Sequence, residues 1–157
     1  FESLDNGFID SFVLDRGLVL LIDYGYVASE YYLPERRQGT LVCHYQHRAH
    51  HNPFWYPGLQ DISAFVDFSE VAYAAVDADF RVAGYTSQAA FLMGTGLADL
   101  HQELLVDDAM NQLRLSQQIK TLTLPSEMGE KFKAMALTRG LDIPLRGFEA
   151  LDQRHRL

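Results

Sequence analysis

Five aliphatic residues in a row, Leu18 to Ile22, run directly into Asp23, Tyr24 and Gly25. A continuous apolar run of this length predicts a strand that is covered on both faces. Ligands of open α/β sheets bind beyond the carboxyl ends of the strands, so Asp23 is the first candidate for a functional carboxylate. Two plainer roles stay open: Asp23 could cap the following loop, and Gly25 could serve only a tight turn.

Acids and aromatic rings follow this strand in close succession. The acids are Glu30, Asp61 and Asp67, and the adjacent rings of Tyr31 and Tyr32 could stack on a cation. Carboxylates and aromatic rings both bind cations, so this mixture suits a cationic partner such as an Arg- or Lys-bearing peptide. The alternatives are structural: Asp61 could bond loop amides, Asp67 could cap a helix, and the tyrosines could pin the loop to the core.

A cluster of histidines lies in the segment HYQHRAHH, which holds His44, His47, His50 and His51. Spacings of three and four residues can place two imidazoles on one helix face for a metal. No acid or second cysteine completes a ligand set, so we interpret these histidines as polar loop residues that shape a pocket, and we expect no metal. The nearby segment RRQGT could contact an anion, but one glycine does not make a phosphate loop.

Composition narrows the class of protein. The chain has 157 residues, 48% of them hydrophobic and 22% charged, as in one globular domain. Its net charge of -8 would repel a nucleic-acid backbone and suits a cationic peptide better. No apolar run is long enough to cross a membrane, and no secretory leader opens the chain. The single Cys43 fits a reducing compartment, and the start at Phe1 suggests part of a longer protein.

The element pattern alternates strands with helices. Residues 1–16 predict a short helix or loop, and residues 26–60 predict an ordered aromatic insertion, because they hold three of the five prolines and no clean periodicity. Asp67 and Glu70 predict a capping box for a helix that ends near residue 78.

Further along the chain, Phe80–Tyr85 predicts a strand, and Thr86 could cap the short helix after it. Residues 98–120 are helical in pattern, and Phe132–Gly140 predicts a last strand. The apolar positions of that helical stretch are Leu100, Leu104, Met110, Leu113 and Leu115. This order predicts an α/β sheet of mainly parallel type, small enough to be part of a larger one.

Several ordered motifs resemble one known family. They are LLIDYGYVASEYYLPERRQGTLVCHYQHRAHH, PGLQDISAFVDFSEVAYAA, GYTSQAAFLMGTG and EMGEKFKAMALTRG. Together, over residues 18–140, they resemble the C-terminal half of the MidA-like methyltransferases, which are related to a mitochondrial complex I assembly factor.

The resemblance implies a class I methyltransferase fold, that is, a Rossmann-like sheet whose last strand is antiparallel. Gly17–Tyr24, Phe80–Tyr85 and Phe132–Thr138 would be its strands five, six and seven, with the long insertion and flanking helices around them. All 157 residues would form a single domain, the C-terminal portion of a larger one. Two positions depart from the pattern: Phe65 stands where many relatives carry His, and Ser63 where many carry Thr.

The implied activity is S-adenosylmethionine-dependent methylation of a protein arginine. The family's glycine-rich loop, acidic second-strand end and Asn-Glu motif would precede Phe1, so we expect this chain alone to be inactive and not to bind S-adenosylmethionine. We also expect a cytoplasmic location (mitochondrial in a eukaryote), and self-association through the sheet edge where strand four would pair.

Strand end and resemblance together predict the site. The catalytic residues would be Asp23, Glu30 and Asp61, and the cofactor would meet Asp23 and Gly25. The substrate would be bound by Tyr24, Tyr31, Tyr32, His44, Tyr45 and Gln60. The alternative is a non-catalytic interaction domain that uses the aromatic insertion. A small α/β hydrolase is disfavoured because no Gly-x-Ser-x-Gly motif occurs.

Overall fold

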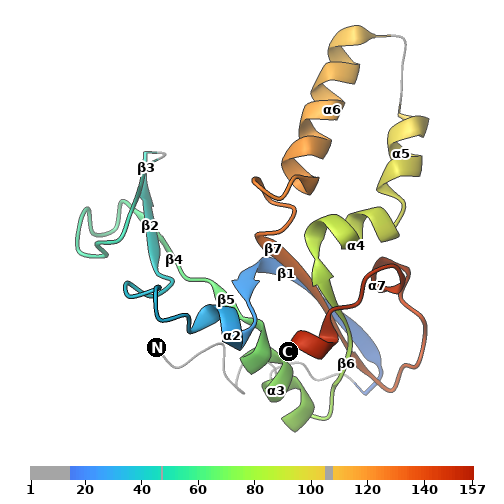
Figure 1. Ribbon diagram of the computed structural model, residues 1–157, viewed down its shortest axis with the longest axis horizontal. Coiled ribbons are helices and arrows are strands. Elements are labelled where there is room, and N and C mark those ends of the chain that lie inside the picture. The colour runs from blue at the N-terminus through green and yellow to red at the C-terminus, as the bar shows by residue number, and fades with distance from the viewer. Residues whose placement is uncertain (1–14, 47, 105–107) are drawn as a thin grey trace.

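A central sheet of four strands organises the computed structural model, which describes residues 15–46, 48–104 and 108–157 (Figure 1). The strands lie in the order β5 (Val66–Asp67), β1 (Gly17–Tyr26), β7 (Phe132–Arg139) and β6 (Arg81–Ser87). β5 pairs parallel to β1, whereas β7 pairs antiparallel with both β1 and β6. The predicted α/β class is confirmed, but the expected mainly parallel pairing is wrong for the described strands. The ladders are mostly antiparallel because β7 separates β1 from β6, as the resemblance implied for the last strand.

One face of the sheet packs on helix α3 (Phe68–Asp77). The Asp67 side chain accepts hydrogen bonds from the backbone N–H groups of Ser69 and Glu70, at 3.0 and 3.3 Å, so the predicted cap is confirmed. Capping fixes the helix start directly after β5, which places the apolar face of α3 on the sheet. The largest core residues on this side are Phe68, Tyr85, Met135 and Leu137.

The other face packs on α4 (Gln88–Gly94) and α7 (Arg146–Glu149), with the Phe148 ring against Ala134 and Ala136. Ser87 caps α4 by accepting from the Ala90 N–H at 3.4 Å, whereas the predicted cap, Thr86, is buried in β6. The prediction was one residue early because β6 continues through Ser87 before the chain turns.

The helical stretch after α4 differs from its prediction. It consists of α5 (Leu97–Glu103) and α6 (Ala109–Thr123), with residues 105–107 outside the described chain. The two helices project away from the sheet in Figure 1, so their apolar positions meet solvent. The predicted apolar residues are accordingly 49–67% exposed in four cases, Leu100, Leu104, Met110 and Leu113, whereas Leu115 is half-buried.

The aromatic insertion carries its own small sheet. The insertion begins with the helix α2 (Ala28–Tyr31). Three strands follow: β2 (Val42–Tyr45), β3 (Arg48–His50) and β4 (Asp61–Ser63). These strands form an antiparallel sheet in the order β3-β2-β4, so the structured part extends past the predicted limit at residue 60.

The described ranges contain neither a metal-binding cluster nor a membrane-spanning helix. His47 lies outside those ranges, and within them no group of three or more His, Cys, Asp or Glu side chains could hold a metal ion. None of the described helices combines the length and apolar character that crossing a bilayer requires.

Strand β1 is less covered than its sequence predicts. Val19 and Leu21 pack on the core, but Leu18, Leu20 and Ile22 are 38–44% exposed on the opposite face of the strand. The second edge of β1 meets a described strand only at Gly25 and Tyr26, where β5 pairs with it. One face of β1 therefore exposes aliphatic side chains, and the last of them, Ile22, lies close to the carboxyl end of the strand.

Candidate functional site

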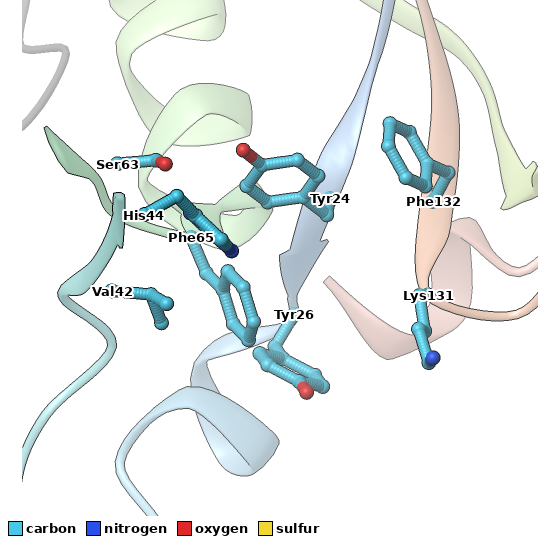
Figure 2. Close-up of a pocket in the computed structure, with 8 residues that line it drawn as sticks. All are labelled: Tyr24, Tyr26, Val42, His44, Ser63, Phe65, Lys131 and Phe132. Carbon is cyan, nitrogen blue, oxygen red and sulfur yellow. The ribbon is translucent and has the colours of Figure 1, made fainter. Parts of the chain in front are cut away.

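A pocket of about 330 Å³ lies where the carboxyl end of β1 meets the insertion and the start of β7 (Figure 2). Its volume is at the lower end of the range for small-ligand sites. The pocket is lined by Tyr24, Tyr26, Val42, His44, Ser63, Phe65, Lys131 and Phe132. Three separate chain segments thus converge at the sheet edge where ligands of open α/β sheets bind.

Aromatic rings form the wall of the pocket in an unbroken series. Tyr24 contacts Phe132 edge-on, with ring centroids 5.0 Å apart, and contacts Phe65 on its other side at 5.4 Å. Phe65 in turn lies 5.3 Å from the Tyr26 ring. Edge-to-face pairs at these distances stabilise one another, so the wall is a defined surface and not a loose group of side chains.

Local backbone geometry explains how this wall forms. Side chains alternate along a strand, so Tyr24 and Tyr26 point to the same side of β1. The residue between them, Gly25, is closely packed: a Cβ there would lie 2.2 Å from the Val66 carbonyl oxygen and 2.8 Å from the Phe68 ring. Gly25 therefore permits the close approach of β5 to β1, which brings Phe65 against the tyrosines.

The polar groups of the pocket are few. His44 on β2 and Ser63 on β4 come from the insertion, and Lys131 directly precedes Phe132, with its nitrogen pointing away from the Phe132 ring in Figure 2. The Lys131 ammonium donates to the Ser126 carbonyl oxygen at 2.7 Å. The Arg36 guanidinium stacks on Tyr26, 4.1 Å from the ring centroid.

Two of the predicted site residues line this pocket, Tyr24 and His44. Asp23 lies on the opposite side of β1, where its carboxylate accepts a hydrogen bond from the Tyr24 N–H at 2.8 Å. Asp61 is exposed on β4 and is the cross-strand neighbour of His44. Glu30 forms an ion pair with Arg156 at the C-terminal end of the chain.

The other predicted substrate residues hold the insertion together. The Tyr31 hydroxyl hydrogen-bonds with that of Thr40 at 2.9 Å, and Tyr32 beside it is 68% exposed. Tyr45 stacks on Tyr56 at 4.2 Å, and the Gln60 amide donates to the Pro53 carbonyl oxygen at 2.6 Å. None of these residues, nor Gly25, is among the lining residues of the pocket.

Sequence reasoning missed most of the wall. The alternation of β1 was a usable signal for Tyr26, which must share a side with Tyr24. Phe132 and Lys131 gave no local signal, because they reach the pocket only through the antiparallel register that pairs Tyr24 with Phe132. Val42, Ser63 and Phe65 depend likewise on how the insertion folds back onto β1.

Comparisons with known proteins agree on one class. Residues 9–86 match the family described as "Putative S-adenosyl-L-methionine-dependent methyltransferase". A curated relative from Drosophila melanogaster, "Protein arginine methyltransferase NDUFAF7 homolog, mitochondrial", is 31% identical over 129 residues, which is 81% of this chain and 28% of the relative.

Two crystal structures from Burkholderia thailandensis are closer in sequence. Each is 45% identical to this chain, with a TM-score of 0.93 over 97% of it. One is a native structure of an uncharacterized protein, of which this chain covers 41%. The other is bound to S-adenosyl-homocysteine, and this chain covers 40% of it.

The fold is that of part of a class I methyltransferase sheet, and these matches agree with that class of protein. More particularly, the chain belongs to the MidA-like methyltransferase family. It spans well under half of the length of the relatives that it matches.

Proposed function

We propose that this chain forms the substrate-side wall of an S-adenosylmethionine-dependent methyltransferase that acts on a protein arginine. The observation that carries the proposal is the similarity, at 45% identity and a TM-score of 0.93, to a structure bound to S-adenosyl-homocysteine. That compound is what remains of S-adenosylmethionine after its methyl group has been given away. The name of the Drosophila relative supports a protein arginine as the acceptor.

The described residues suit the substrate side better than a cofactor cradle. When bound, S-adenosylmethionine supplies a methyl group activated by its sulfonium. Glycines that cradle such a ligand leave open space beside their Cα atoms, whereas the space beside Gly25 is filled by Val66 and Phe68. The rings of Tyr24, Phe65 and Phe132 instead offer a rigid apolar wall, which excludes water and restricts how a substrate can lie.

A carboxylate is still needed to orient an acceptor guanidinium. Of the predicted acids, Asp61 lies across the β2–β4 ladder from pocket residue His44, and it is exposed. We therefore assign the orienting role to Asp61 at the rim, and Asp23 remains a second candidate on the far side of β1. Methyl transfer needs an in-line approach of the acceptor nitrogen, so a rim carboxylate would act by restricting the direction of that nitrogen.

The test uses the complete methyltransferase domain, with S-adenosylmethionine and protein or peptide acceptors, and detects methylarginine by mass spectrometry. Tyr24→Ala should lower kcat/KM at least about tenfold, because it removes the central ring of the wall. Tyr45→Ala is the matched control, since Tyr45 stacks on Tyr56 within the insertion and does not line the pocket. Absence of methylarginine in the unaltered protein would refute the proposal.

Calorimetry separates the role of this chain from that of the complete domain. We expect no appreciable S-adenosylmethionine binding by the 157 residues alone, and micromolar affinity would contradict that expectation. A second function, a non-catalytic interaction domain, is favoured by the exposed apolar side chains of the insertion, above all Phe54 at 86% and Leu59 at 70% exposure. Cofactor binding by the complete domain together with no methyl transfer would favour this second function.

A further inference from the structure

Two cationic side chains flank the aromatic wall of the pocket. Arg36 stacks on Tyr26 from outside the lining, and Lys131 is a lining residue that directly precedes Phe132 in the chain. In the described ranges, the carboxylates within 4.0 Å of a Lys or Arg nitrogen belong to other pairs, those of Arg81, Lys133, Arg154 and Arg156. Among the described residues of the pocket lining, Lys131 is the one charged residue, in a chain whose net charge is -8.

The acids nearest to the pocket do not neutralise the charge of Lys131 within the lining. Glu35, next to Arg36 in the chain, is exposed, and Asp23 is engaged with the Tyr24 N–H on the opposite side of β1. Asp61 stands across from His44 on the small sheet. None of these three carboxylates lines the pocket, whose lining includes a lysine and no acid.

Such a pocket is a poor receptor for a guanidinium. Buried cations need a carboxylate partner, and a second cation close to Lys131 would be repelled. Arg36 already draws on the π electrons of Tyr26, so a second cation on that ring gains less. The acceptor arginine itself is thus not the group for which the inner pocket is built.

The same pocket suits an aromatic group that bears a negative charge. The series of rings from Phe132 to Tyr26 can pack against another ring. The Lys131 ammonium has three protons and one described acceptor, the Ser126 carbonyl oxygen, so it can donate to an anion as well. The Ser63 hydroxyl and the His44 imidazole are two further groups of the lining that can donate.

We propose that this pocket binds an aromatic group next to a carboxylate, contributed by a residue pair such as Phe-Asp that neighbours the acceptor arginine in the protein substrate. The source of the ligand rests on the proposed function, but its chemistry rests on the pocket alone. The pocket would then select the sequence around the arginine, while the rim would orient the arginine itself.

Direct binding tests the chemistry without methyl transfer. Three probes of the same shape, 3-phenylpropanoate, 3-phenylpropanamide and 3-phenylpropylammonium, are titrated into the complete domain and followed by NMR. We expect the anion to bind at least about fivefold more tightly than the cation, a ratio typical of one partly exposed ion pair. Lys131→Glu should reverse this order. Lys120→Glu on α6, outside the pocket lining, makes the same charge change and should leave the order intact.

Peptide substrates test whether the ligand comes from residues beside the acceptor arginine. Arginine peptides that carry Phe-Asp beside the acceptor should be methylated with at least about fivefold higher kcat/KM than peptides with Phe-Lys, and Lys131→Glu should abolish the difference. Equal probe affinities, no probe binding, or identical behaviour of the two lysine variants would overturn the pocket assignment. Probe selectivity without peptide selectivity would overturn the assignment to a protein substrate. Loss of all methylarginine with probe selectivity intact would refute the proposed function and leave the pocket chemistry supported.

Discussion

The central sheet and the aromatic insertion use their apolar residues in opposite ways. In β7, every residue from Lys133 to Thr138 is buried, between α3 on one face and α4 and α7 on the other. In the insertion, Phe54, Trp55, Tyr56 and Leu59 are 49–86% exposed, and Cys43 is buried. The sheet is therefore the source of stability, and the insertion carries an exposed apolar surface outside the pocket lining.

The largest expected contrast between the two regions comes from one pair of identical substitutions. Phe68→Ala in α3 should lower the free energy of unfolding by about 3–5 kcal/mol, because the ring is fully buried and a cavity would remain. Phe54→Ala in the insertion should change it by less than about 0.5 kcal/mol, because that ring is 86% exposed. Denaturant unfolding measures both, and similar losses would show that the insertion is part of the stabilising core.

Two glycines give a second contrast between the regions: Gly25 in β1 is held in crowded surroundings, whereas Gly58 in the insertion has open space and a positive φ. Gly25→Ala should cost about 3 kcal/mol, because the new methyl would meet the Val66 carbonyl oxygen and the Phe68 ring. In the insertion, the new Cβ of Gly58→Ala would have no neighbouring atom within 4 Å. This substitution should lower the free energy of unfolding by only about 1 kcal/mol, because of the strain of the positive φ of 78°. The measurement is again the free energy of unfolding. A reversed order would mean that β5 moves freely away from β1.

Tyrosine ionisation extends the comparison to pH. Burial, and to a lesser degree the charge of Glu30, raises the pKa of Tyr85 far above its ordinary 10.0, while Arg156 opposes the shift. The folded state thus keeps the phenol neutral above pH 10, where the unfolded chain ionises. Stability present below pH 10 is therefore lost as the pH rises further, by about 1.4 kcal/mol per unit.

Matched variants isolate this effect in unfolding measurements between pH 9 and 11. Tyr85→Phe should flatten the decline in stability, because the group that titrates in the unfolded chain is gone. Tyr56→Phe, at a side chain that is 49% exposed in the insertion, is the matched control for removal of a tyrosine hydroxyl. An unchanged slope in Tyr85→Phe would contradict the buried, neutral phenol.

Local sequence signals predicted the elements better than the contacts between them. The aliphatic run at Leu18 and the cap at Asp67 act within a few residues, so β1 and the start of α3 were correctly placed. The pocket depends on the β1–β7 register, which brings Phe132 to Tyr24 from more than a hundred positions away. The exposure of the α5 and α6 leucines was equally invisible, because periodicity indicates an apolar face but not whether another element covers it.

The catalytic role predicted from the sequence for Glu30 stays a prediction, and the structure shows a structural role for the same side chain. The structure pairs it with Arg156, 126 residues away, so that the beginning of the insertion is joined to the 3-10 helix η1 (Arg154–Arg156) that packs beside β6. The Arg156 side chain is 37% exposed and the Glu30 side chain 35%. Solvent screens such a pair, so we expect it to stabilise the fold by about 0.5 kcal/mol.

A double-mutant cycle distinguishes a structural role of the Glu30–Arg156 ion pair from a catalytic role of Glu30. Glu30→Gln and Arg156→Gln, alone and together, should reveal a coupling free energy of about 0.5 kcal/mol in unfolding and change the kcat/KM of methylation by less than about twofold. Asp61→Asn, at the residue to which we assign the orienting role, is the comparison and should lower kcat/KM while leaving stability within about 0.5 kcal/mol. If Glu30→Gln instead abolished methyl transfer with no effect on unfolding, Glu30 would be the catalytic acid, and the link between insertion and sheet would be the site of the chemistry.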